Sequence, residues 1–316
     1  MNNFTKEEFW KNFNIGREVQ LAGNFIYDGL LIFDKMESFY NEDEIFEFLY
    51  FISVGIERLI KADIILIEHS NEINQDEFEN SLRSHNHSEL IKRINKSHEL
   101  NLGKVHNEFI QILSKFYKSC RYDRFGLDDF ENSNKEKSIL INFINKYLEI
   151  NISNEFLSVT PNDKRIKSFI GRTIKKIVDS LYEVVRIESR KLNIYTYEVR
   201  TFSKAYKIFL EKDFTFEREK ILQKEVLIHL LKNSEDSGFK KHISDHLPPL
   251  EFDNYLENTY SKCLFDLTKC SEFLDELEHL YEEQENKKFR FEALDVIGSD
   301  IHFTKDIEDE TNEFDE

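Results

Sequence analysis

The apolar residues of segment 42–69 recur at intervals of three and four positions, which is the spacing of one face of an α-helix. The members of this stripe are Ile45, Phe48, Leu49, Ile52, Ile56, Leu59, Ile60 and Ile64. Asn41 stands just before the stripe as an N-cap residue, and three acidic residues follow it, where the positive end of a helix favours them. The stripe therefore predicts a long amphipathic helix over 42–69.

Residues that interrupt helices are scarce in this chain. Its 316 residues include 9 glycines and 3 prolines, too few turn residues for a sheet-rich fold of this length. Similar periodicity predicts helices over 15–39, 87–100, 104–120, 138–150, 163–212 (one or two helices), 216–233 and 252–287. The sequence therefore predicts an all-α protein with less than a tenth of its residues in β-strands.

Several stretches without this periodicity suggest how the chain is divided. Segment 70–86 is polar and reads as a loop with one short helix, and Asn233–Leu250 contains two adjacent prolines and reads as a linker. Segment 305–316 holds seven acids and one lysine, which predicts a disordered acidic tail. We expect a helical bundle over 1–127 and a second helical region over 138–290.

The bulk properties of the chain limit its class. No uncharged apolar run reaches the roughly 18 residues that span a bilayer, and the N-terminus lacks a signal-peptide pattern. The 3 cysteines suit a reducing compartment. We therefore expect a cytoplasmic protein that does not contact a membrane. The histidines at 85, 87, 98 and 106 lack matching carboxylate or thiol spacing, so we predict no metal and no cofactor.

Three phrases occur in an order that resembles the HEPN superfamily of small helical domains. They are Gly55-Ile-Glu-Arg-Leu-Ile-Lys-Ala62 within a helix, Ser84-His85-Asn86-His87-Ser88-Glu89-Leu90 after a polar loop, and Phe116-Tyr117-Lys-Ser-Cys-Arg121-Tyr122-Asp123-Arg124-Phe125 at a helix end. The resemblance covers about residues 42–125. It implies a HEPN-like bundle, commonly a homodimer, of the kind found in prokaryotic toxin and antiviral defence proteins.

The resemblance also implies a chemistry. Ribonucleases of this superfamily cleave RNA without a metal, using the 2′-hydroxyl as nucleophile, a histidine for proton transfer and an arginine beside the phosphorane. One Arg-x4-His motif occurs here, from Arg93 to His98, outside the expected helix end. The other pairing that the phrase order suggests is Arg121 with His85, flanked by Tyr122 and Arg124. Many HEPN-like domains lack the pair and serve as binding or assembly modules.

A basic segment stands out against the acidic chain. Residues 164–207 hold twelve Lys or Arg and four acids, a net charge of +8, whereas the whole chain carries −18. Tyrosines at 182, 195, 197 and 206 are interleaved with these cations, and such patterns bind phosphates and stack unpaired bases. We expect RNA to contact Lys175, Lys176, Arg186, Arg190 and Lys191.

Two other interpretations of this segment stay open. The basic helix could dock on the acidic run 276–285 of the same chain, or on an acidic partner protein. The leading hypothesis is a cytoplasmic HEPN-like protein that binds or cleaves RNA as an effector or accessory of a toxin or antiviral system. The alternative is a non-catalytic helical scaffold that holds a partner protein.

Overall fold

The computed structural model describes residues 6–70, 72–120, 135–153, 159–194, 203–232, 238–266, 270, 273–282 and 284–299. Within these residues it contains 13 α-helices and no β-strand, with one isolated bridge between Ser38 and Pro161. The all-α prediction is therefore confirmed for the described part of the chain. Contacts divide the chain into two compact units, Met1–Phe216 and Glu217–Glu316.

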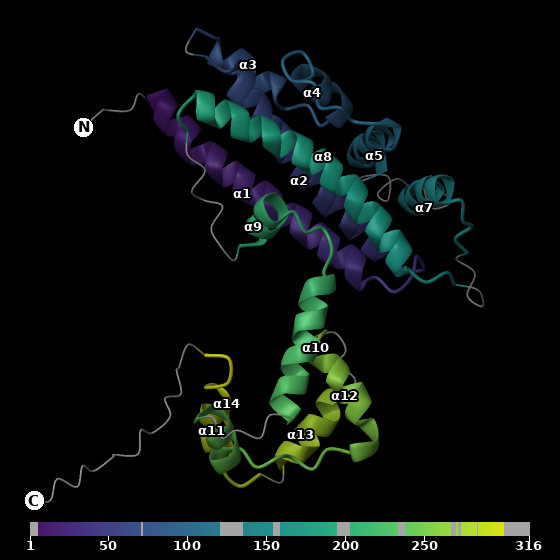
Figure 1. Cartoon of the computed structure of the whole chain (residues 1–316), viewed down its shortest axis with the longest axis vertical. Helices are drawn as coiled ribbons and strands as arrows, with labels where there is room; N and C mark the ends of the chain where they lie inside the picture. Colours follow the sequence, from purple (N-terminus) through teal and green to yellow (C-terminus); the bar gives the residue numbers. More distant parts are fainter. Residues whose placement is uncertain are drawn as a thin grey trace, which may run out of the picture. The chain divides into compact units, whose positions relative to one another are not determined.

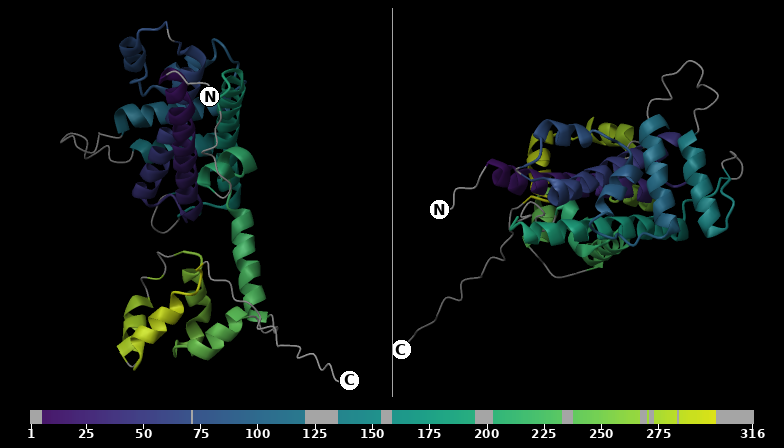
Figure 2. Two further views of the ribbon diagram at one scale, coloured as in Figure 1. Left: turned by 90° about the vertical axis from the view of Figure 1, so that its left-hand side faces the viewer. Right: turned by 90° about the horizontal axis from the view of Figure 1, so that it is seen from above.

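The helices of the first unit are α1 (Lys6–Lys35), α2 (Glu42–Glu68), α3 (Gln75–Ser81), α4 (His87–Ile94), α5 (Lys104–Lys115), the π-helical turn η1 (Phe116–Cys120), α7 (Lys135–Leu148), α8 (Lys164–Lys191), α9 (Lys204–Tyr206) and the π-helical turn η3 (Lys207–Glu211). Figure 1 shows α1, α2 and α8 as three long neighbouring helices, with α3, α4, α5 and α7 along one side of them. The two further views in Figure 2 show the same layering of this unit.

Helix α2 is the centre of the first unit, because it packs against α1, α4, α5, α7 and α8. Its apolar stripe is fully buried, and the rings of Phe33 and Phe48 meet with centroids 4.6 Å apart between α1 and α2. A helix surrounded in this way also buries some of its polar positions. These include Glu57 and Asp63, whose surroundings define the chemistry described below.

Close approach between helices depends on glycine at one crossing in particular. A Cβ atom at Gly23 of α1 would lie 2.6 Å from both Cα and Cβ of Ala205 in α9. Only a residue without a side chain allows this contact, since real Cβ atoms do not approach other carbons so closely. The short helix α9 therefore rests directly on the α1 backbone.

The second unit contains α10 (Glu217–Lys232), α11 (Gly238–His246), the 3-10 turn η4 (Asn254–Leu256), α12 (Glu257–Cys263), α13 (Leu274–Glu282) and α14 (Lys287–Leu294). Among its described residues, the buried apolar side chains are Leu247 and Ala293. Helix α10 instead exposes apolar side chains around its circumference, namely Ile221, Leu222, Val226, Ile228, Leu230 and Leu231. This unit accordingly has a much smaller core than the first.

Most helix predictions are confirmed, with corrections at the C-terminal side. The helix predicted over 42–69 is α2, and that predicted over 216–233 is α10. The single long helix predicted over 252–287 is wrong, because η4, α12 and α13 are separate elements there. The linker predicted at Asn233–Leu250 contains helix α11, so its prolines end a helix rather than mark a structureless connection.

The division into units also differs from the one that the sequence suggested. Helices α7 and α8, which we assigned to a second region beginning at 138, belong to the same compact unit as α1 to α5. The buried face of α8, including Ile174, Val178 and Leu181, supplies part of that core. The acidic tail 305–316 lies outside the described residues. No helix in the described part of the chain is both long and apolar enough to cross a bilayer.

Candidate functional site at the α2, α4 and α5 corner

A carboxylate–histidine pair lies where the start of α4 meets the middle of α2. Nδ1 of His85 donates to the Glu57 carboxylate, at 3.0 Å from Oε2, and Nζ of Lys61 donates to Oε1 of the same group at 2.7 Å. The Glu57 side chain is 10% exposed and that of His85 is 50% exposed. A buried, doubly hydrogen-bonded carboxylate therefore orients a histidine that reaches solvent.

The next residues of α4 explain why His85 is held in this place. His87 is fully buried, and its Nε2 donates to the carbonyl oxygen of Ser53 on α2 at 2.9 Å. One residue later, the backbone N–H of Ser88 donates to Oγ of Ser114 on α5 at 3.2 Å. The first turn of α4 is thus tied to both neighbouring helices, which fixes the segment that carries His85.

Burial determines the protonation state of the second histidine. It lowers the pKa of His87, although the Ser53 carbonyl and the Glu57 charge act in the opposite direction. His87 is therefore neutral at physiological pH and acts as a structural donor. His85 is the histidine of this corner that remains accessible to a substrate.

The end of α5 completes the corner with an aromatic ring. Helix α5 widens into the π-helical turn η1, and Tyr117 in this turn packs on His85 with ring centroids 4.8 Å apart. Such turns carry one extra residue per turn and often occur at functional sites. Tyr117 also meets His87 edge-on at 6.3 Å, so its ring spans both histidines.

Three predicted site residues, Arg121, Tyr122 and Arg124, lie outside the described residues. The sequence places Arg121 four positions after Tyr117. The approach of Arg121, Tyr122 and Arg124 to His85 therefore stays a prediction.

Arg93 and His98 of the Arg-x4-His motif bind different carboxylates. The guanidinium of Arg93 on α4 donates to both oxygens of Glu68 at the end of α2, at 3.1 and 2.6 Å, and to the carbonyl of Ser81. Nε2 of His98 lies 2.7 Å from Oε1 of Glu188 on α8. Each side chain connects two elements of the first unit, which is a sufficient structural role for both residues.

The carboxylate that binds His98 sits in a small polar cluster. Burial alone would raise the pKa of Glu188, but hydrogen bonds from Lys191 and His98 lower it overall. Asp63 on α2 is completely buried, and burial followed by the Glu188 charge raises its pKa well above the usual value. No described residue donates a hydrogen bond to either oxygen of Asp63. Glu188 is thus ionised, whereas Asp63 is held towards its neutral form.

The basic residues predicted to bind RNA divide into two groups along α8. Lys176 is exposed, and half-buried Lys175 donates to the carbonyl of Lys212 at 2.6 Å. The three residues of the C-terminal half are also exposed. Two of them pair within the helix, Arg186 with Glu183 and Lys191 with Glu188, both at 2.7 Å. These ion pairs reduce the positive potential of the C-terminal half, where Arg190 also lies.

No group of three or more metal-type side chains converges among the described residues. Glu57, Lys61 and Tyr117 were missed as site residues by the sequence reasoning. All three belong to, or lie within, the phrases that carry the HEPN resemblance, so those phrases held the signal. Neither a protein-family model, nor a curated protein, nor a solved structure matches this chain.

Proposed function

We propose that this chain is a HEPN-like, RNA-directed protein in which His85 performs proton transfer during metal-independent cleavage of RNA. The observation that carries this proposal is the hydrogen bond from Nδ1 of half-exposed His85 to the buried Glu57 carboxylate. A carboxylate at Nδ1 fixes the tautomer in which Nε2 holds the lone pair. Nε2 is then the base that the chemistry requires.

The proposed step is a transesterification within the RNA strand. Nε2 of His85 takes the proton of a 2′-hydroxyl, the 2′-oxygen forms a bond to phosphorus, and the 5′-oxygen of the next nucleotide leaves. The leaving oxygen takes a proton from water and His85 later releases its proton to water, so the products are a 2′,3′-cyclic phosphate and a 5′-hydroxyl. Arg121 is proposed to stabilise the phosphorane charge, and Arg124 and Tyr122 are proposed to contact the substrate.

The biological setting follows from the resemblance alone. HEPN-like proteins of toxin and antiviral systems commonly act as homodimers in the cytoplasm, with a partner protein that restrains or directs them. We propose the same setting for this chain, with no cofactor or metal needed for the cleavage.

The test compares two histidines that the sequence placed near the chemistry. Full-length protein is incubated with total RNA in excess chelator, as wild type, His85→Ala and His98→Ala. Loss of a general base lowers cleavage by about 10²–10⁴-fold, which we expect for His85→Ala only. A loss confined to His98→Ala would transfer the chemistry to the Arg93 and His98 pair. Equal cleavage by all three proteins would exclude both sites.

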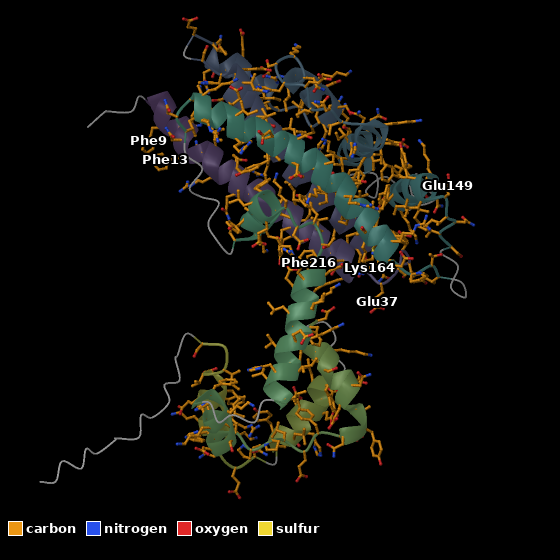
Figure 3. All side chains as sticks on the ribbon, viewed as in Figure 1. Phe9, Phe13, Glu37, Glu149, Lys164 and Phe216 are labelled. Carbon is orange, nitrogen blue, oxygen red and sulfur yellow. The ribbon has the colours of Figure 1, made fainter. Side chains whose placement is uncertain are left out.

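A second candidate function is a non-catalytic scaffold that holds a partner protein. The observation in its favour is apolar surface: Phe9 and Phe13 on α1 are 56% and 50% exposed, with ring centroids 4.4 Å apart (Figure 3). Helix α10 adds the exposed apolar side chains described above. Complete absence of RNA cleavage by the wild-type protein would favour this function.

A further inference from the structure

The N-terminal half of α8 presents a regular row of cations around one aromatic ring. Arg165, Phe169, Arg172 and Lys176 follow one another at steps of four, three and four residues, so they lie on one face of the helix. The opposite face is buried in the core of the first unit. The row is therefore carried on a helix whose position is fixed by packing.

Helix α7 adds a second ring beside Phe169. Tyr147 stacks on Phe169 with ring centroids 6.1 Å apart, and the guanidinium of Arg165 donates to the carbonyl of the adjacent Leu148 at 2.8 Å. The hydroxyl of Tyr147 donates to Glu108 of α5 at 2.7 Å. Burial and this carboxylate raise the pKa of Tyr147 to about 12. The half-buried ring therefore packs on Phe169, its hydroxyl is held by Glu108, and Nζ of Lys146 lies 5.2 Å from its centroid.

The start of α5 borders the same face. Helix α5 packs against α8. Burial, followed by the charge of Lys176, lowers the pKa of His106 on α5. Lys104 lies one helical turn before Glu108, and Lys146 of α7 donates to both oxygens of Glu108 at 2.7 and 2.6 Å. Among the described residues of this face, the Glu108 carboxylate is therefore already paired with a lysine.

We call the surface formed by Lys104, Lys146, Tyr147, Arg165, Phe169, Arg172 and Lys176 the α5–α7–α8 face. Neither Arg172 nor Lys176 forms an ion pair within the part of the chain that the structure describes. Acidic residues mark its limits: Glu149 follows the last residue of α7, and Asp179 and Glu183 lie further along α8. Figure 3 labels Glu149 and, at the start of α8, Lys164 on this side of the first unit.

We propose that the α5–α7–α8 face binds single-stranded RNA, with phosphates on Arg165, Arg172 and Lys176 and an unpaired base that replaces Nζ of Lys146 against the Tyr147 ring. Cations spaced along a groove or helix follow a phosphodiester backbone, and an aromatic face accepts any base by stacking. The choice of RNA as the ligand rests on the proposed function. The C-terminal half of α8 differs, because Glu183 and Glu188 already pair with Arg186 and Lys191 there.

The aromatic ring favours a single strand over other anionic partners. A duplex hides its base faces, so a ring offered for stacking adds affinity only for unpaired bases. A lipid surface attracts cations without a requirement for a fixed ring, and an acidic peptide has no base to stack. The contribution of the Tyr147 ring to affinity therefore distinguishes RNA binding from a general attraction between opposite charges.

The experiment measures fluorescence anisotropy of a labelled oligouridylate with the full-length His85→Ala protein, which leaves the probe intact. In this background, Arg172→Gln/Lys176→Gln should weaken binding and reduce the slope of log affinity against log salt by about 1.4, since each lost phosphate contact removes about 0.7. Tyr147→Leu should weaken binding by roughly 5-fold or more while leaving the salt slope unchanged. The matched control is Lys92→Gln/Lys96→Gln, which removes two exposed charges from α4 and its end.

Equal affinity of the Arg172/Lys176 variant and the control variant would overturn the proposal, as would absence of oligouridylate binding by the parent protein. The proposal would also be overturned if phosphatidylserine vesicles or polyglutamate bound with the same affinity as RNA and Tyr147→Leu left that affinity unchanged. Plain charge attraction would then explain the binding. If the protein binds RNA through this face but wild type cleaves none, the inference holds and the proposed cleavage fails. If wild type cleaves RNA but the Arg172/Lys176 variant binds RNA as the control variant does, the proposed cleavage holds and the inference about this face fails.

Discussion

The Glu57 carboxylate of α2 holds Nδ1 of His85 at 3.0 Å, although 28 positions separate the two residues in the sequence. Lys61 binds the other oxygen of the same carboxylate. We expect Glu57→Gln to reduce RNA cleavage less than His85→Ala does, because the amide keeps the size of the side chain and an acceptor oxygen but loses the charge that fixes the tautomer. Initial rates of cleavage in chelator measure this order. A Glu57→Gln variant that cleaves RNA at the wild-type rate would contradict an orienting role for Glu57.

Asp63→Asn should stabilise the protein at neutral pH. Burial, followed by the Glu188 charge, raises the pKa of Asp63, so the folded state retains a proton that the unfolded chain loses near pH 4. The stability that this group contributes is therefore present below about pH 4 and is lost as the pH rises through the folded pKa. Asparagine needs no proton, so the melting temperature at pH 7 should rise by about 2–4 °C for each kcal/mol recovered.

The control for Asp63 is another aspartate of the same unit. Asp28 forms an exposed ion pair with Lys204 at 2.6 Å, and such pairs contribute about 0–1 kcal/mol. Asp28→Asn should leave the melting temperature nearly unchanged or slightly lower. If Asp63→Asn melts below wild type at pH 7, and by the same amount at pH 4, the pKa of Asp63 is not raised in the folded protein.

His87→Gln should flatten the acid side of the stability curve. Burial lowers the pKa of His87, so the unfolded chain takes up a proton near pH 6.5 before the folded protein does. The stability linked to His87 is present above about pH 6.5 and is lost as the pH falls towards the folded pKa. Glutamine can still donate to the Ser53 carbonyl but does not titrate. Urea unfolding at pH 7.5 and 5.5 should show a smaller difference for the variant than for wild type.

Gly23→Ala should destabilise the first unit. The added Cβ would meet the Ala205 backbone at 2.6 Å, and forcing a methyl group into such a crossing costs about 1–3 kcal/mol. Gly103→Ala is the comparison, because the atom nearest to its added Cβ would be Nδ1 of His106 at 3.5 Å, an ordinary contact. Thermal melts followed by circular dichroism should show a larger loss at position 23. Equal losses at the two glycines would mean that α9 does not rest on α1 as described.

Local sequence patterns predict a helix well where an apolar stripe at helical spacing continues over many turns. Helix α2 follows from its apolar stripe, and α8 follows from Ile170, Ile174, Ile177 and Leu181 at the same spacing. The composition of 252–287 favours helices throughout, which predicts one continuous helix. The boundaries of η4, α12 and α13 depend on local turns and on packing, which propensity does not contain.

The candidate site was predicted only in part, and the reason is distance along the chain. The order of the phrases indicates His85, but its partner Glu57 lies on α2, 28 positions earlier in the chain. His98 lies 90 positions from Glu188, and no spacing rule links residues so far apart. The Arg-x4-His motif was visible because it is local, yet its two side chains bind Glu68 and Glu188 on different helices. Short motifs report proximity in sequence, whereas the contacts of a helical bundle come from its packing.

Helix α8 carries its cations on one side and core residues such as Ile174 and Leu181 on the other. The backbone beneath Arg172 and Lys176 is consequently ordered before any ligand arrives. A flexible strand that binds there loses its own conformational entropy, while the protein gives up only side-chain rotamers. Affinity at this surface should therefore depend strongly on how stiff the ligand is, so that strands already stacked in the bound geometry bind more tightly than flexible strands of equal charge.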